Sequence, residues 1–112
     1  MAKTKVGILG ATGMVGQRLI TLLENHPWFE VVCVAASPSS AGKAYEEAVK
    51  GRWNMKTAIP ANVRKLVVKK VENDMDEICK EVDFIFSAVE MDKQKVMEIE
   101  EKYASNGIPV VS

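Results

Sequence analysis

Short apolar runs alternate with amphipathic stretches along the whole chain. The runs, such as EVVCVAA, are rich in β-branched residues and apolar at successive positions, as parallel strands buried on both faces are. The stretches between them place apolar residues at helical spacing. The pattern predicts strands over residues 5–9, 30–36, 66–71, 83–89 and 109–111, and helices over residues 13–25, 41–49, 74–80 and 92–105.

This alternation predicts the fold. Strands that alternate with helices form parallel sheets with right-handed crossovers. We therefore expect an α/β, Rossmann-like doubly wound parallel sheet over residues 1–112, a single dinucleotide-binding domain, with strand order 3-2-1-4-5. The lysines in the third strand place it near an edge, and residues 51–62 read as an irregular connection. Ligands in such sheets bind beyond the carboxyl ends of the strands, here the first and fourth.

A glycine-rich turn, GATGMVG, joins the first strand to the first helix. A helix N-terminus offers free N–H groups and a partial positive charge to a phosphate. Gly10 would allow the tight turn, Gly13 would let a pyrophosphate approach the backbone, and Gly16 would let the helix pack closely on the sheet. With both flanking elements in place, the motif indicates a dinucleotide site; the alternative is a tight turn that binds nothing.

The segment after the second strand, AASPSSAGK, helps to choose the cofactor. NAD sites usually carry an Asp or Glu near this point to hold the ribose hydroxyls. This chain has no carboxylate there, and its serine hydroxyls and Lys43 suit a 2′-phosphate, which favours NADP. An ordinary serine-rich loop is the alternative. The small residues Ser87 and Ala88 end the fourth strand and leave space for the nicotinamide-side ribose, or simply pack against the first helix.

Composition excludes several classes of protein. The 15 basic and 15 acidic residues balance, whereas a nucleic-acid-binding protein needs a basic excess. The apolar runs fall short of the roughly 20 residues of a membrane span, and no signal-peptide pattern is present. We expect a cytoplasmic protein. Two cysteines and one histidine are too few for a disulfide framework or a zinc site, so no metal is expected. Cys33 lies in a predicted strand, Cys79 on a predicted helix and His26 at the far end of the first helix, and these positions argue against a catalytic role.

Three segments resemble one family. GILGATGMVGQRLITLLENHPWFEV, AASPSSAGKAYEEAV and DFIFSAV are similar to the N-terminal part of aspartate-semialdehyde dehydrogenases of the archaeal and fungal branch, and the similarity runs from Lys5 to Ser112. The glycine turn is shared by many dehydrogenases, but SPSSAGKAY is more specific. The resemblance implies NADPH-dependent reductive dephosphorylation of aspartyl phosphate to aspartate semialdehyde, a step towards lysine, methionine, threonine and isoleucine.

The resemblance also implies roles for individual residues. The family's nucleophilic cysteine, acid/base histidine and substrate-binding arginines belong to a segment beyond Ser112, so no catalytic residue is assigned here. The stretch GRWNMKTAIP departs from the family's pattern, and nothing is carried over to Arg52 or Trp53. By similarity, Thr12, Gly13, Met14 and Val15 line the pyrophosphate, Ser37 and Ser40 meet the 2′-phosphate, and Ser87 and Ala88 lie along the nicotinamide side.

The chain ends at Ser112, directly after a predicted strand. We expect it to be the cofactor-binding part of a longer enzyme, inactive without a catalytic and dimerisation domain, and the whole protein to be a homo-oligomer. Malonyl-CoA reductase and N-acetylglutamyl-phosphate reductase share this architecture and are close alternatives. An extended short-chain dehydrogenase or epimerase has a similar turn, but its Tyr-x-x-x-Lys pair is missing here. A non-catalytic NADP-binding sensor is the alternative of a different class.

Overall fold

The computed structural model describes residues 3–89 and 92–111. Strands and helices alternate along most of the chain, with two short helices between the second and third strands. The elements are β1 (Thr4–Leu9), α1 (Met14–Leu22), β2 (Phe29–Ala36), α2 (Tyr45–Ala48), α3 (Ala61–Arg64), β3 (Lys69–Lys70), α4 (Met75–Glu81), β4 (Phe84–Ser87), α5 (Lys93–Ser105) and β5 (Val110–Val111).

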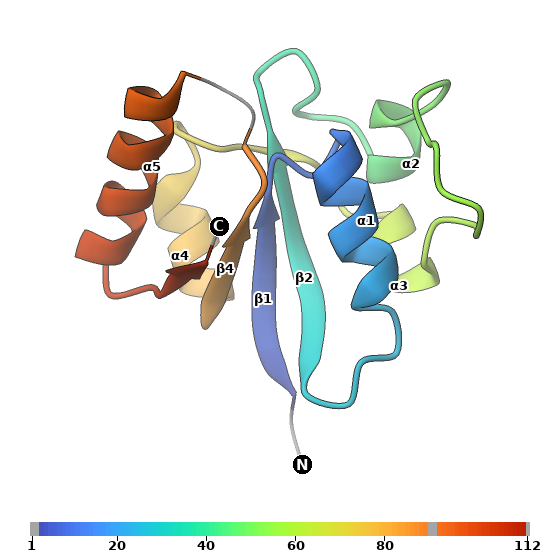
Figure 1. Cartoon of the computed structure of the whole chain (residues 1–112), viewed down its shortest axis with the longest axis horizontal. Helices are drawn as coiled ribbons and strands as arrows, with labels where there is room; N and C mark the ends of the chain where they lie inside the picture. The colour runs from blue at the N-terminus through green and yellow to red at the C-terminus, as the bar shows by residue number, and fades with distance from the viewer. Residues whose placement is uncertain (1–2, 90–91, 112) are drawn as a thin grey trace.

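All five strands join one parallel sheet in the order β3-β2-β1-β4-β5. Helices α1, α2 and α3 cover one face and α4 and α5 cover the other, so the sheet lies between two helical layers (Figure 1). This confirms the predicted doubly wound fold and its strand order. Because β1 and β4 are neighbours at the centre, their carboxyl ends form the switch point at which ligands bind in such sheets.

Each face of the sheet has its own hydrophobic core. Side chains of a strand alternate between faces, so Ile8 and Val34 pack towards α1 while Leu9 and Ala35 pack towards α4 and α5. Burial on both faces explains why the sequence of β2 is apolar at successive positions. Within the described ranges, no helix is long and apolar enough to cross a membrane.

The third strand is shorter than its sequence pattern predicts. Only Lys69 and Lys70 pair with β2, whereas residues 66–68 hydrogen-bond to the segment before α2. Val67 forms an antiparallel bridge with Ala44, and Tyr45 N–H donates to the Leu66 carbonyl at 2.8 Å. The apolar pattern indicated burial correctly at Val68 and Val71 but not at Val67, which is exposed. The first half of the predicted strand pairs with a loop and not with the sheet.

Helix boundaries differ from the predictions where a turn stops the helix early. The first helix ends at Leu22, three residues before the predicted end, and Asn25 takes a left-handed conformation with φ of 57°. The predicted helix over residues 41–49 shrinks to Tyr45–Ala48, because Gly42 has a φ of +87°. The end of the predicted connection forms the short helix α3, which begins after Pro60. The last helix ends at Asn106-Gly107, as predicted.

Candidate cofactor-binding site

Two glycines of the GATGMVG segment, one in the turn after β1 and one in the first turn of α1, are required by close backbone contacts. Gly10 has a φ of +73°, and a Cβ built on it would lie 2.5 Å from the Ala88 carbonyl oxygen. A Cβ on Gly16 would lie 2.3 Å from the Gly10 carbonyl oxygen. Gly13 is extended, with φ of −81° and ψ of 173°, a conformation open to any residue. Its backbone conformation therefore does not demand glycine, and the predicted approach of a phosphate stays its proposed reason.

The N-terminus of α1 is open to an anion. Gly13 occupies the N-cap position, so no side chain caps the helix, and its first turn holds no acidic residue. Met14 and Val15 are 54% and 53% exposed. The first N–H groups of a helix have no partner within the helix and carry a partial positive charge. This end of α1 therefore offers N–H donors, and no acidic side chain in its first turn offsets their partial positive charge.

Two buried side chains hold the carbonyl groups of the same turn. The Tyr45 hydroxyl donates to the Ala11 carbonyl at 2.6 Å, and Gln17 Nε2 donates to the Thr12 carbonyl at 3.0 Å. Tyr45 is fully buried and Gln17 almost so, and burial raises the pKa of Tyr45 above its ordinary value, so its proton stays in place. With its carbonyls bound to these donors, the turn is fixed without using a charged group.

Gln17 also joins the turn to the segment 52–54. Its Nε2 donates to the Arg52 carbonyl at 3.1 Å, and its Oε1 accepts from Asn54 N–H at 3.0 Å. The Trp53 ring meets the Tyr45 ring edge to face, with centroids 6.3 Å apart. The stretch that departs from the family's sequence pattern therefore supports the two residues that hold the turn. Sequence reasoning missed this role; the one signal was a polar residue one turn after Gly13.

A pocket of about 150 Å³ opens where the turn meets the carboxyl ends of the strands. A second pocket of about 320 Å³ continues it towards β3, because Ala36, Ser37 and Val71 line both. The first is lined by Gly10, Thr12, Gly13, Ala36, Ser37, Val71, Ala88 and Val89; the second is lined by Ala36, Ser37, Pro38, Lys70, Val71, Glu72, Asn73 and Lys95.

Comparison with known proteins agrees with this geometry. Residues 5–112 match the family described as the semialdehyde dehydrogenase NAD-binding domain. The chain belongs to this family. Aspartate-semialdehyde dehydrogenase of Schizosaccharomyces pombe is 43% identical over all of this chain and 29% of its own length, and that of Methanothermobacter thermautotrophicus is 44% identical over 92% of this chain and 28% of its own.

A crystal structure of aspartate-semialdehyde dehydrogenase with NADP from Candida albicans has a similar fold. It superposes with a TM-score of 0.84 at 37% identity, over 99% of this chain and 29% of that one. These relatives confirm the resemblance to the N-terminal part of the fungal and archaeal enzymes. This semialdehyde dehydrogenase domain spans less than a third of the length of the relatives named here.

The structure places the predicted 2′-phosphate residues unequally. Ser37 is exposed and lines both pockets, and its Oγ lies 2.9 Å from Ser39 Oγ. Ser40 is buried and Lys43 is exposed, and neither lines either pocket. The domain therefore presents one serine of the predicted set directly to the pocket. Lys70 and Lys95, which the sequence analysis did not single out, are the lysines in the pocket wall.

The end of β4 lies beside the glycine turn. Ala88 N–H donates to the Leu9 carbonyl at 2.8 Å, and Ala88 lines the first pocket. Ser87 is buried, and its Oγ has no hydrogen-bond partner within residues 3–89 and 92–111. Buried hydroxyls are nearly always paired, so Ser87 has a hydrogen-bonding capacity that the described residues leave unused, although it lines neither pocket.

The cysteines and the histidine lie away from this edge. Burial raises the pKa of Cys33 to about 12, and burial also raises that of Cys79, so both thiols stay protonated and unreactive at neutral pH. His26 accepts hydrogen bonds at Nδ1 from the N–H groups of Trp28 and Phe29, where the chain turns back into β2. Among the described residues, no three His, Cys, Asp or Glu side chains gather as a metal site would require.

Proposed function

We propose that this chain is the NADP-binding domain of an aspartate-semialdehyde dehydrogenase. The observation that carries the proposal is the glycine turn: its carbonyls are held by Tyr45 and Gln17, while the uncapped end of α1 faces the pocket edge. A pyrophosphate needs such a set of unoccupied N–H donors. The Candida albicans relative, similar over 99% of this chain, is described with NADP.

The residues proposed for the cofactor divide into three groups along the pocket edge. The pyrophosphate group lies on the turn and first helical residues, the 2′-phosphate group follows β2, and the nicotinamide group ends β4. The orphan hydroxyl of Ser87 supports the third group. The groups are Gly10, Thr12, Gly13, Met14 and Val15; Ser37 and Ser40; and Ser87 and Ala88.

Two observations favour NADP over NAD. The segment from Ala36 to Lys43 holds no carboxylate that would repel a 2′-phosphate. Its serines offer neutral donors instead, and Ser37 lines the pocket. A carboxylate at the end of the second strand is the usual NAD-selecting group, so its absence from this segment leaves room for the phosphate.

The proposed reaction of the whole enzyme is the reductive dephosphorylation of aspartyl phosphate to aspartate semialdehyde. This domain would bind the hydride donor, and the catalytic residues would come from the rest of the protein, which forms more than two thirds of each relative. We propose that the whole protein is a cytoplasmic homo-oligomer that supplies the synthesis of lysine, threonine, methionine and isoleucine. The domain alone would not catalyse the reaction.

Isothermal titration calorimetry with NADP tests the binding proposal. Gly13→Val adds a branched side chain where the pyrophosphate would approach, so it should abolish binding without preventing folding. Gly107→Asn is the matched control, because Gly107 lies at the end of α5 with open space around it, and asparagine tolerates its φ of +83°. Unchanged NADP affinity in Gly13→Val would contradict the proposed site.

A chimaera tests the enzymatic part of the proposal. The present chain replaces the matching N-terminal segment of the Schizosaccharomyces pombe enzyme, with which it shares 43% identity. We expect NADP-dependent turnover of aspartate semialdehyde in the presence of phosphate, the reverse of the biosynthetic reaction. Because the Schizosaccharomyces pombe segment would supply every substrate contact, this chimaera tests whether the domain delivers NADP to the family's reaction and not which substrate the whole protein uses. A folded chimaera that binds NADP without turnover would count against the assignment.

A further inference from the structure

The register of the sheet brings β3 to the end of β2. Ala35 pairs with Lys69 and Ala36 pairs with Lys70, so Lys70 lies beside the last residue of β2. Ser37 follows directly. This is the place where dinucleotide-binding sheets meet the ribose that carries the 2′ group. The register therefore places a side chain of the neighbouring strand beside the end of β2, where the loop after β2 begins.

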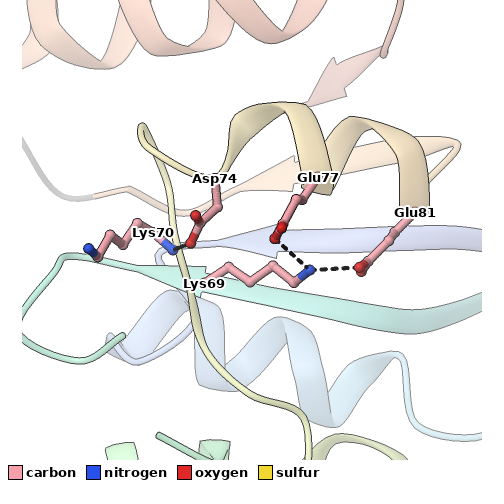
Figure 2. Close-up of polar contacts among 5 residues, drawn as sticks. All are labelled: Lys69, Lys70, Asp74, Glu77 and Glu81. Atoms are coloured by element: carbon pink, nitrogen blue, oxygen red, sulfur yellow. Dashed lines mark hydrogen bonds and ion pairs between the residues drawn. The ribbon is translucent and has the colours of Figure 1, made fainter. Parts of the chain in front are cut away.

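Lys69 and Lys70 are neighbours in sequence with opposite surroundings (Figure 2). Lys69 Nζ lies 2.6 Å from a Glu81 carboxylate oxygen and 3.4 Å from one of Glu77, both on α4. The hydrogen bond to Glu81 raises the pKa of Lys69. The Lys70 side chain points away from these carboxylates in Figure 2, and within the described part of the chain it forms no ion pair.

The main chain at Lys70 is fixed although its side chain is exposed. Lys70 N–H donates to Asp74 Oδ2 at 2.8 Å, the contact drawn beside Lys70 in Figure 2. The Asp74 carboxylate thus closes the turn that leads into α4 and does not cap the helix by a side-chain bond. Lys70 is held at the sheet edge by its backbone, and its ammonium group remains available to a ligand.

The pocket wall contains one uncompensated positive charge. Lys70, Glu72 and Lys95 are its charged residues, and Lys95 Nζ lies 3.9 Å from Glu72 Oε1. The charges of Lys95 and Glu72 cancel each other, so Lys70 is the one charged residue of this wall that has no partner within it. Ser37 and Pro38 line the same pocket, whereas Lys43 does not. The sequence analysis expected a positive charge from Lys43 in the loop after β2, whereas the pocket wall contains Lys70 of β3.

We propose that Lys70 binds the 2′-phosphate of NADP and is a specificity-determining residue for NADP over NAD. This rests on the proposed function, since it assumes that the adenosine half of the cofactor occupies the second pocket. An ammonium group gains a charge-assisted bond with a phosphate, which NAD replaces by a hydroxyl. Ser37 would add a neutral donor to the same phosphate.

The test is titration of the wild type, Lys70→Met and Lys69→Met with NADP and with NAD. Methionine keeps most of the aliphatic stem and removes the charge. We expect Lys70→Met to weaken NADP binding by roughly tenfold and to leave NAD binding unchanged, because one charged hydrogen bond is lost. Lys69→Met is the matched control and should leave the ratio of the two affinities unchanged, because α4 already neutralises Lys69.

The outcomes separate the two proposals. If the wild type binds neither cofactor, alone or joined to the remainder of the Schizosaccharomyces pombe enzyme, the proposed function fails, and this inference fails with it. If the wild type prefers NADP and Lys70→Met keeps that preference, only the role of Lys70 is overturned. If Lys43→Met loses the preference for NADP over NAD and Lys70→Met keeps it, the residue that selects NADP lies in the loop after β2, and the proposal for Lys70 is overturned.

Discussion

The two faces of the sheet hold its carboxyl edge by different chemistry. On the α1 face, two buried neutral groups, Tyr45 and Gln17, donate to carbonyls of the glycine turn. On the other face, the buried Tyr103 hydroxyl donates to the Val71 carbonyl at 2.5 Å, but β3 is also bound to α4 by the ion pairs of Lys69. The glycine turn is therefore held without charge, whereas the edge strand is held partly by charge.

This difference matters for a site that must bind an anion. A carboxylate placed to fix the turn would repel the pyrophosphate and offset the partial charge of the helix N-terminus. Buried neutral hydrogen bonds fix the turn and leave that potential intact. At β3, the carboxylates of Glu77 and Glu81 lie on α4 and pair with Lys69, and none of the ion pairs among the described residues includes the Lys70 ammonium group, although the Asp74 carboxylate binds the Lys70 N–H.

The largest expected effect comes from adding one methyl group to the α1 face. In Gly16→Ala, the new Cβ would lie 2.3 Å from the Gly10 carbonyl oxygen and 2.7 Å from Ala11 Cα, and backbone atoms have no room to yield. We expect a loss of about 3 kcal/mol in the free energy of unfolding, measured by urea denaturation.

Gly7→Ala makes the matching change towards the other face. Its Cβ would lie 3.2 Å from Cγ1 of the buried Val82 side chain, a longer contact than those of Gly16 and one with a side chain instead of the backbone, so the expected loss is smaller, about 1 kcal/mol. Equal losses in the two variants would show that the turn is not packed more tightly than the sheet interior.

Removal of the tyrosine hydroxyls gives the next largest effect. Tyr45→Phe and Tyr103→Phe each leave a buried carbonyl without its donor, so each should cost about 1–3 kcal/mol in denaturation experiments. Only Tyr45 acts on the turn, so its variant should also lose affinity for a ligand containing the pyrophosphate, and should keep its affinity for 2′-AMP. An equal loss for both ligands would indicate general unfolding rather than a disturbed turn.

The same tyrosines predict a fall in stability at high pH. Burial raises the pKa of Tyr45 and Tyr103 from 10.0 in the folded state, while unfolded tyrosine ionises near that value. Above it, the unfolded state releases protons that the folded state retains, so stability present below pH 10 is lost as pH rises. Guanidinium denaturation between pH 9 and pH 11 should show this fall, and the Tyr45→Phe/Tyr103→Phe double variant should show a smaller one. Cys33, with its pKa raised to about 12, adds a fall in the same direction.

The smallest effect is expected at the ion pairs of β3. Glu81→Gln removes the closer partner of Lys69 and should cost about 0.2–1 kcal/mol, because the glutamate is partly exposed. The loss should shrink in 1 M salt, which screens exposed charges. Gln17→Met on the α1 face should cost the same in low and high salt. A salt-dependent cost at Gln17 would contradict the proposed contrast between the faces.

Much of this arrangement could be predicted from the sequence. The alternation of apolar runs and helical patterns predicts the parallel sheet and its order, because burial on both faces leaves a clear trace in the sequence of β2 and β4. The short span of β3 could not be predicted, because the side chains of Leu66 and Val68 do not indicate whether their backbone pairs with β2 or with the loop at Ala44. Apolar patterning reports burial and not the partner of a backbone hydrogen bond.

Only the local part of the candidate site could be predicted from the sequence, because the sequence does not show which distant segments contact each other. The glycine turn is local in sequence, so its motif indicates both its shape and its position. Gln17, Tyr45 and Lys70 reach the pocket edge through contacts between distant segments, and neither their residue type nor their spacing signals that. Lys43 seemed a natural phosphate ligand because it is near in sequence, whereas the parallel register places Lys70 nearer to the end of β2.

The most direct test of the central claim follows the backbone amides of the turn. The 112-residue chain is suited to ¹⁵N–¹H correlation spectra recorded as NADP is added. We predict that the largest shifts occur at the amides of Thr12, Gly13, Met14 and Val15, because the pyrophosphate would bond to them, with smaller shifts at Ser37 and Ala88. Saturation with NADP that moves other amides and leaves those of the turn in place would contradict the account.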